Sequence, residues 1–204
     1  RHISTTGCAA RVLDAGCGTG GNMDELHRIL VGSEIIGIDI NPFAVGFSKQ
    51  RKAGSVLRAS VEDLPFAENA FDLVVSMDVL YVKDVNGQKA VKEFYRVLKP
   101  GGSLLMNLPA FEFLRGSHDL AVHTGQRYTK SKVSELLSAA PFTVKKLTYW
   151  NAVLFPILAL WRPLSRICAC GDAPRSDLRP LPLFVNRALT WLILKEIQIM
   201  RYLR

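Results

Sequence analysis

Three glycines at alternate positions follow an apolar run and an acid in the segment Val12-Leu13-Asp14-Ala15-Gly16-Cys17-Gly18-Thr19-Gly20. A chain that turns sharply from strand into helix visits positive φ and lets a ligand approach its backbone, and glycine allows both. Gly16, Gly18 and Gly21 also fit the G-x-G-x-x-G spacing of dinucleotide sites, where a helix N-terminus receives a pyrophosphate. Asp14 favours a cationic ligand, because its carboxylate repels a pyrophosphate and attracts an ammonium or sulfonium group. We therefore expect a cofactor-binding loop.

Short apolar runs alternate along the chain with segments of helical periodicity. The expected strands cover 12–14, 35–40, 71–77 and 103–108, and the helices that follow them cover 22–30, 42–53, 86–98 and 130–140. This alternation predicts an α/β fold with a doubly wound, mostly parallel sheet between two layers of helices. Because crossovers in such a sheet are right-handed, the glycine-rich loop and Asp39 are expected at the same carboxyl edge.

The helix expected over 86–98 shows how such a helix packs. Its apolar residues are spaced for one buried stripe, formed by Ala90, Val91, Phe94, Val97 and Leu98. Its charged residues are expected to face solvent, and they are Lys89, Lys92, Glu93 and Arg96. Pro100 and the two glycines after it end the helix. A sixth strand is expected over 142–149, and no clear seventh strand follows it.

The segment from Asp14 to Gly20 resembles the first motif of class I methyltransferases, which use S-adenosylmethionine. Further segments resemble the family in its order along the chain: 34–39, 59–66, 71–80 and 96–102. The resemblance covers about residues 10–160. It implies a three-layer αβα sheet of the class I methyltransferase type, with residues 1–150 as the cofactor-binding domain.

The resemblance also implies roles for individual residues, with S-adenosylmethionine as cofactor and S-adenosylhomocysteine as product. Asp39 is expected to take both ribose hydroxyls. Ser60 stands where family members often carry an acid, so adenine contacts are expected from backbone amides, and Glu62 and Asp63 fit solvated loop charges equally well. The expected cofactor-binding residues are Asp14, Gly16, Cys17, Gly18, Gly20, Asp39, Ile40, Ser60, Val61, Glu62 and Met77. Asp78 and Tyr81 are expected to bind the substrate.

Residues 117–129, directly after the expected fifth strand, are similar to a His-Asp and Arg-Tyr-Thr segment in a subgroup of bacterial methyltransferases. His118 or His123 could remove a proton from the attacking group, with Asp119 orienting the ring. Arg127 could hold an anionic group, and Tyr128 is expected beside it at the substrate. The alternative is structural, because Asp and Arg close together on a loop are often each other's partner.

The positive charge is confined to the C-terminal half. Residues 1–110 carry 12 basic and 12 acidic side chains, whereas residues 111–204 carry 14 and 6, which accounts for the whole net charge of +8. This asymmetry favours an anionic small molecule, a lipid-linked acceptor or a membrane surface. No basic stripe interleaved with aromatic residues is present, so no nucleic acid partner is expected.

Residues 151–204 form a C-terminal extension of apolar and basic segments. The nearly uncharged run 151–163 contains a proline and is too short to span a bilayer, which needs about 20 apolar residues. The helix expected over 183–203 is amphipathic and contains Trp191. The extension is expected either to cap the methyltransferase domain or to lie on a membrane surface through 152–203.

Composition agrees with one compact enzyme domain, since 204 residues with 49% apolar content can build a sizeable core. Four cysteines do not make a disulfide framework, and no signal peptide is visible, so a cytoplasmic location, peripheral to the membrane if the extension binds it, is expected. Cys168 and Cys170 lack further ligands, and no metal site is expected. Only about ten residues precede the first strand, so the helix that usually covers the cofactor is expected to be short or missing.

The sequence thus predicts an S-adenosylmethionine-dependent methyltransferase that methylates a small-molecule or lipid-linked, anionic acceptor by in-line transfer. Two alternatives stay open. A nicotinamide-dependent Rossmann oxidoreductase would use the same glycines, although Asp14 speaks against it. A catalytically silent module that binds the nucleoside cofactor is the other alternative. The sequence leaves open the acceptor, the need for a general base and the oligomeric state.

Overall fold

The computed structural model describes residues 9–51, 54–156, 159 and 182–202 of the chain. These residues fall into two compact units. The first unit comprises the chain up to Pro109 together with Ser134–Phe142, and it contains the glycine-rich loop and Asp39. The second unit comprises Ala110–Val133 and the described residues from Thr143 onward.

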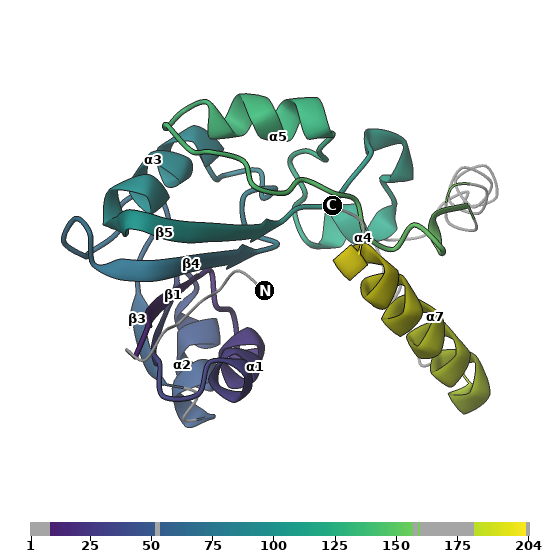
Figure 1. The fold of residues 1–204 in the computed structure, drawn as a ribbon, viewed down its shortest axis with the longest axis horizontal. Helices are drawn as coiled ribbons and strands as arrows, with labels where there is room; N and C mark the ends of the chain where they lie inside the picture. The colour runs from purple at the N-terminus through teal and green to yellow at the C-terminus, as the bar shows by residue number, and fades with distance from the viewer. Residues whose placement is uncertain (1–8, 52–53, 157–158, 160–181, 203–204) are drawn as a thin grey trace. The chain divides into compact units, whose positions relative to one another are not determined.

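The first unit is built on a five-stranded, all-parallel sheet (Figure 1). Its strands are β1 (Arg11–Ala15), β2 (Glu34–Asp39), β3 (Ser55–Arg58), β4 (Phe71–Met77) and β5 (Leu98–Asn107). Their order in space is β3-β2-β1-β4-β5, so the direction of winding reverses between β1 and β4. In sheets of this kind, ligands bind outside the carboxyl ends of the strands beside that reversal. The predicted doubly wound sheet is confirmed.

Helices cover both faces of the sheet (Figure 1). Helices α1 (Gly21–Ile29) and α2 (Pro42–Gln50) lie on one face, and α3 (Gly87–Val97) lies on the other. Met23 of α1 and Val45 of α2 are buried in one apolar cluster with Val12 of β1. Helix α3 buries the predicted stripe, since Ala90, Val91, Phe94 and Val97 are all 0% exposed. The three-layer architecture is therefore held by apolar residues at strand and helix spacing.

Two strand assignments from the sequence need correction. The predicted strand over 142–149 is wrong, because none of these residues lies in a strand. Strands need a neighbour for their N–H and C=O groups, and none of the five described strands pairs with this segment. The sequence pattern also misses β3, because this edge strand buries only one residue, Val56, and shows no apolar run.

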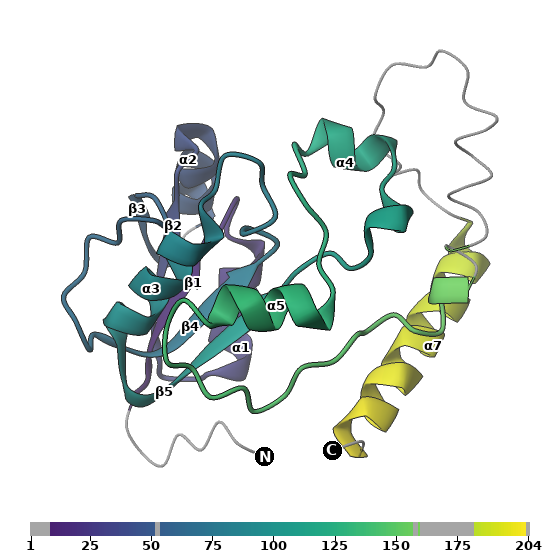
Figure 2. The ribbon, with the colours of Figure 1, turned by 90° about the horizontal axis from the view of Figure 1, so that it is seen from above.

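The second unit contains η1 (Glu112–Leu114), α4 (Ser117–Ala121), the first turn of α5 (Lys130–Leu137) and α7 (Leu183–Tyr202). Helix α7 confirms the predicted C-terminal helix. The backbone N–H groups of Ala152 and Val153 donate to the Glu196 carboxylate at 2.7 and 3.2 Å, so this part of the chain is tied to α7, as Figure 2 shows.

Some predicted features lie outside the described residues. They include Cys168, Cys170, most of the second half of the apolar run 151–163 and the side chain of His118. Within the described residues, no helix combines the length and apolar character that crossing a membrane requires.

Candidate cofactor site

The loop between β1 and α1 has the backbone shape that its glycines allow. Gly16, Gly18 and Gly20 have φ of +90°, +55° and +84°. The N–H groups of Gly16 and Cys17 donate to the Ile38 carbonyl at 2.9 and 2.8 Å, which holds the loop against the end of β2. A Cβ atom added at Gly16 would lie 2.2 Å from Cγ2 of Val79. Gly16 is thus required by its conformation and by the chain that follows β4.

Asp39 ends β2 beside this loop, and both of its carboxylate oxygens are fixed by backbone groups. Oδ2 accepts a hydrogen bond from the Gly18 N–H at 2.9 Å, and Oδ1 accepts one from the Asn41 N–H at 2.8 Å. Each oxygen keeps a second lone pair, so the carboxylate can still accept from two neighbouring hydroxyl groups. The next residue, Ile40, leaves 66% of its surface exposed and offers an apolar face.

Asp14 is an acid in an unusual environment. It lies in the middle of the sheet on β1, is 0% exposed, and neither carboxylate oxygen has a hydrogen-bond partner among the described residues. Burial, reinforced by the negative charge of Asp39, raises the pKa of Asp14 to about 7. A buried carboxylate without a partner is costly, and a positive charge brought close to it would offset that cost.

Cys17 is buried in the same loop. Burial, with the charges of Asp14 and Asp39, raises the pKa of its thiol to about 12, so the sulfur is neutral at physiological pH. A neutral thiol is a poor nucleophile and metal ligand. In the structure Cys17 packs as a small apolar side chain in the core cluster.

The predicted adenine segment is a tight turn after β3. The Glu62 N–H donates to the Ser60 hydroxyl at 3.1 Å, and Val61 is 7% exposed. The Glu62 carboxylate accepts from the Asn86 N–H at 2.8 Å, so it joins this turn to the start of α3. Glu62 therefore has a structural contact of its own, beyond the solvated charge that the sequence allows.

Two charged residues of α3 hold the same segment, although the sequence pattern places them in solvent. Glu93 accepts from the Leu64 N–H at 2.8 Å, while Arg96 donates to the carbonyls of Leu64 and Phe66 at 2.9 and 2.7 Å. Glu93 and Arg96 also form an ion pair of 2.7 Å. The expectation that they face outward is wrong, because both are half-buried against the turn. Their spacing of three residues is also that of an ordinary surface pair, so no sequence signal marks them.

The exit of β4 carries Met77, which is predicted to bind the cofactor, and the predicted substrate residues Asp78 and Tyr81. Met77 is half-buried against the core cluster. Asp78 has φ +57°, its N–H donates to the Asn107 carbonyl, and its Oδ1 accepts from the Asn107 side chain at 2.9 Å. Partial loss of hydration raises the pKa of Asp78, and the hydrogen bond from the Asn107 side chain opposes this shift. Tyr81 follows as a half-buried side chain. Asp78 and Asn107 thus stand together at the carboxyl ends of β4 and β5.

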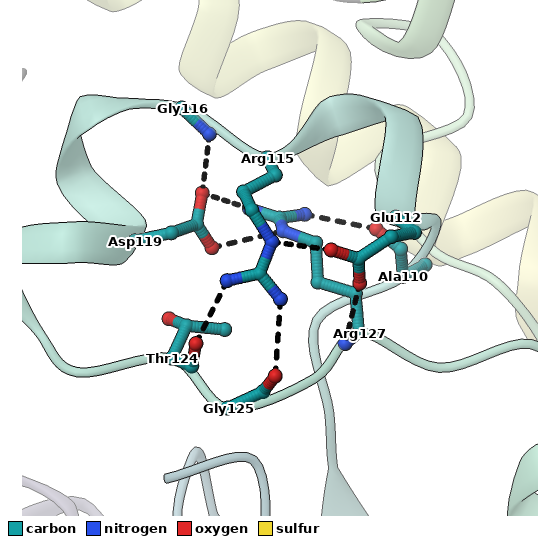
Figure 3. Close-up of polar contacts among 8 residues, drawn as sticks. All are labelled: Ala110, Glu112, Arg115, Gly116, Asp119, Thr124, Gly125 and Arg127. Carbon is teal, nitrogen blue, oxygen red and sulfur yellow. Dashed lines mark hydrogen bonds and ion pairs between the residues drawn. The ribbon is translucent and has the colours of Figure 1, made fainter. Parts of the chain in front are cut away.

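The 117–129 segment of the second unit is organised around a buried ion pair (Figure 3). Arg127 donates to both oxygens of Asp119, at 2.9 and 3.1 Å, and to the Ala110 carbonyl at 2.8 Å. Asp119 also accepts from the Gly116 N–H at 2.7 Å. Burial alone would raise the pKa of Asp119, but these hydrogen bonds outweigh it and lower the pKa.

The other predicted residues of this segment are distributed around that pair. Tyr128 is 3% exposed, and its hydroxyl accepts from the Gln126 amide at 2.6 Å. His123 is exposed and has φ +53°. Arg115 and Glu112 extend the network to Thr124 and Gly125 (Figure 3). Neither residue was predicted from the sequence. The contacts shown in Figure 3 favour the structural alternative for Asp119 and Arg127.

The residues of the first unit fit S-adenosylmethionine. Asp39 offers acceptors for a ribose diol, and the carboxylate of Asp14, which no described residue pairs with, offers negative charge for a cationic ligand. No group of three or more His, Cys, Asp or Glu residues in the described part of the chain could hold a metal ion.

Comparisons with known proteins agree with this site. Residues 13–106 match the family model described as a methyltransferase domain. The chain is 41% identical over 105 residues to the ubiquinone/menaquinone biosynthesis C-methyltransferase UbiE of Haemophilus ducreyi, which covers 47% of this chain and 40% of that protein. It is 30% identical over 183 residues to phthiotriol/phenolphthiotriol dimycocerosates methyltransferase 1 of Mycobacterium ulcerans, covering 84% of this chain and 66% of that protein.

A solved structure shares the fold as well. The YcgJ protein of Bacillus subtilis matches with a TM-score of 0.57 and 25% identity, over 67% of this chain and 64% of that one. The chain spans less than half of the UbiE relative. The matched region contains the glycine-rich loop, Asp39 and the β4 exit. With the sheet order and the geometry of this loop, these matches show that the chain belongs to the class I S-adenosylmethionine-dependent methyltransferase family.

Proposed function

We propose that the protein transfers the methyl group of S-adenosylmethionine to a small-molecule or lipid-linked acceptor. The observation that carries this proposal is the pair of carboxylates at the carboxyl edge of β1 and β2. Asp14 is buried and has no hydrogen-bond partner in the part of the chain that the structure describes, and Asp39 is fixed by two backbone N–H groups. Such a site suits a ligand that carries both positive charge and a diol.

When bound, S-adenosylmethionine supplies a methyl group that its positively charged sulfur activates toward in-line displacement. The chain's own contribution is to orient the cofactor and the acceptor and to exclude water. Asp39 holds the ribose, and Asp14 attracts the positive charge from a buried position where electrostatic interactions are strong. Positioning of the nucleophile in such a site can contribute roughly 7–11 kcal/mol to lowering the barrier.

Asp78 is the best supported acceptor-side residue. It lies at the carboxyl end of β4, and one of its oxygens is oriented by Asn107. The second oxygen can accept a hydrogen bond from a hydroxyl group of the acceptor. The proposed proton-transfer role of His118, Asp119 and His123 has less support, because Asp119 pairs with Arg127.

A lipid-linked acceptor is supported by two observations. The similar proteins include one named for ubiquinone/menaquinone biosynthesis and one named for phthiotriol dimycocerosates. The net charge of +8, carried by residues 111–204, favours an acceptor or surface that is anionic.

We also propose that α7 contacts a membrane surface. Its exposed apolar side chains include Phe184, Trp191 and Ile199, at 75, 59 and 58%. Lys195 lies over the ring of Trp191, with Nζ 5.9 Å from its centroid, an arrangement suited to an interface between apolar and charged surroundings. The protein should co-sediment with phosphatidylglycerol vesicles, and Trp191→Ser should lower the fraction of protein that co-sediments. Equal sedimentation with pure phosphatidylcholine would contradict the role of charge.

The reaction itself is tested by incubating the protein with S-adenosylmethionine labelled in the methyl group and a panel of acceptors. The panel contains isoprenoid-substituted phenols, long-chain alcohols and short water-soluble phenols. Label in the extracted lipid products, strongly reduced with Asp39→Ala, would support the proposal. Cofactor binding without transfer to any acceptor would favour the silent module, and oxidation of NADH with a carbonyl substrate would favour the oxidoreductase.

A further inference from the structure

Asp14 lacks what buried acids in proteins usually have. Buried carboxylates are paired with a cation or hydrogen-bonded, yet both oxygens of Asp14 are without a partner among the described residues. Its neighbours in the sheet register are Gly37 on β2 and Val75 on β4, neither of which can donate from a side chain. The free protein therefore holds a group that can exist as either the acid or the carboxylate.

The negative charge of a neighbouring carboxylate also disfavours the ionised form of Asp14. Asp39 is a second carboxylate acting on it, and Cys17 is a neutral thiol in the adjoining loop. Helix α1 presents the apolar Met23 toward Gly37. The charges of α1 are engaged elsewhere, since Asp24 pairs with Arg51 at 3.5 Å and Glu25 with Arg28 at 3.1 Å. His27, exposed on α1, is the other titratable group of that helix.

We infer that Asp14 makes cofactor binding proton-linked, and that its ionised form makes the site prefer the sulfonium cofactor over the neutral thioether product. This inference rests on the proposed function. S-adenosylmethionine carries an ammonium and a sulfonium charge, whereas S-adenosylhomocysteine keeps only the ammonium. A positive charge beside Asp14 favours the carboxylate, so its proton leaves when the ligand binds.

The consequence for turnover follows from this charge difference. The ionised Asp14 attracts the substrate cofactor more strongly than it attracts the product, so product release is favoured while Asp14 is ionised. When Asp14 is protonated, the preference for S-adenosylmethionine over S-adenosylhomocysteine depends only on Asp39 and on the shape of the site. Asp14 would then be a residue that sets cofactor-over-product preference, in addition to being part of the site.

The size of the effect can be worked out from the burial of Asp14. With a pKa of about 7 in the free protein and a much lower one in the complex, affinity for S-adenosylmethionine should rise roughly tenfold between pH 6 and pH 8. At pH 6.5, binding should release about 0.8 proton per cofactor. The ligand's own amino group also titrates, and titration of the Asp14→Asn variant with the same ligand measures that contribution.

The test is titration calorimetry of both nucleosides at pH 6, 7 and 8, in two buffers of different ionisation enthalpy at each pH. We expect proton release near pH 6.5, and an affinity ratio of cofactor to product that rises with pH. Asp14→Asn should abolish both, while Asp24→Asn, a carboxylate on the exposed side of α1, should leave both unchanged.

The outcomes separate this inference from the proposed function. Binding of both nucleosides with no proton release, or with a ratio that is constant with pH, overturns the role of Asp14 and leaves the cofactor site intact. Proton release that persists in Asp14→Asn also overturns it and assigns the proton to another group of the protein or to the ligand. Binding of neither nucleoside overturns the cofactor site and this inference together.

Discussion

Replacing Gly16 with alanine tests whether the loop after β1 is held as the structure shows. A Cβ at this position would lie 2.2 Å from Cγ2 of Val79, and the backbone has φ +90°. Strain of an L-residue at such a φ costs about 1–2 kcal/mol, and overpacking costs about 1–3 kcal/mol more. For a protein of this size, a total of about 2–5 kcal/mol corresponds to a melting temperature lowered by roughly 5–15 °C.

Gly21→Ala is the matched control. Gly21 starts α1, its φ is not positive, and a Cβ there would meet nothing within 4 Å. This variant should melt at the same temperature as the natural protein or slightly higher, because alanine reduces the freedom of the unfolded chain. Adding Val79→Ala to Gly16→Ala should recover the part of the loss that comes from overpacking.

Differential scanning calorimetry of the four variants, Gly16→Ala, Gly21→Ala, Val79→Ala and the double variant, separates the two contributions. Affinity for S-adenosylhomocysteine, measured on the same samples, should fall with Gly16→Ala and persist with Gly21→Ala. The packing argument fails if Gly16→Ala and Gly21→Ala melt together, or if Val79→Ala recovers nothing in the double variant.

Three further predictions concern charged groups. Arg96→Ala removes the hydrogen bonds to the Leu64 and Phe66 carbonyls. Affinity for S-adenosylhomocysteine, measured by calorimetry, should therefore fall several-fold. Unchanged affinity would mean that the ion pair of Arg96 with Glu93 has only a structural role. Asp119→Asn breaks a buried pair and should cost about 3–5 kcal/mol in urea unfolding at pH 7. Because the pKa of Asp119 is lowered on folding, that contribution exists above about pH 4 and is lost as the pH falls through the folded value, so the variant should show less loss in acid. Asp14 has the opposite sign: its pKa is raised, so stability of the ligand-free protein declines from pH 4 to about 7, and Asp14→Asn should melt higher than the natural protein at pH 8.

The elements that the sequence revealed are those with a buried apolar face. Strands β1 and β4 are nearly continuous runs of buried residues, and α3 has a stripe at helical spacing, so periodicity alone identifies them. Strand β3 escaped because only Val56 is buried in it. The strand expected over 142–149 failed for the converse reason, since an extended apolar pattern makes a strand only where a neighbouring strand pairs with it.

The sequence motif predicted which residues form the candidate site, but it did not predict their hydrogen bonds or charge pairing. Spacing and residue type placed Asp14 and Asp39 beside the glycines. Only the structure shows that Asp39 is fixed by two N–H groups, whereas Asp14 has no hydrogen-bond partner among the residues described. The sequence allowed Asp119 either to orient a catalytic histidine or to pair with Arg127, and only the structure shows that these two side chains form an ion pair of 2.9 Å. Glu93 and Arg96 look like an ordinary helix pair until the turn at Leu64 packs on them.

Isothermal titration of the protein with S-adenosylhomocysteine, with NADH in parallel and Asp39→Ala as the variant, tests the central claim most directly. The account predicts micromolar binding of S-adenosylhomocysteine, no binding of NADH, and at least a tenfold loss with Asp39→Ala. Because Asp39 also accepts from the Gly18 and Asn41 N–H groups, circular dichroism must first show that the variant is folded. Binding of NADH in place of S-adenosylhomocysteine, or equal affinity in folded Asp39→Ala, would contradict the account.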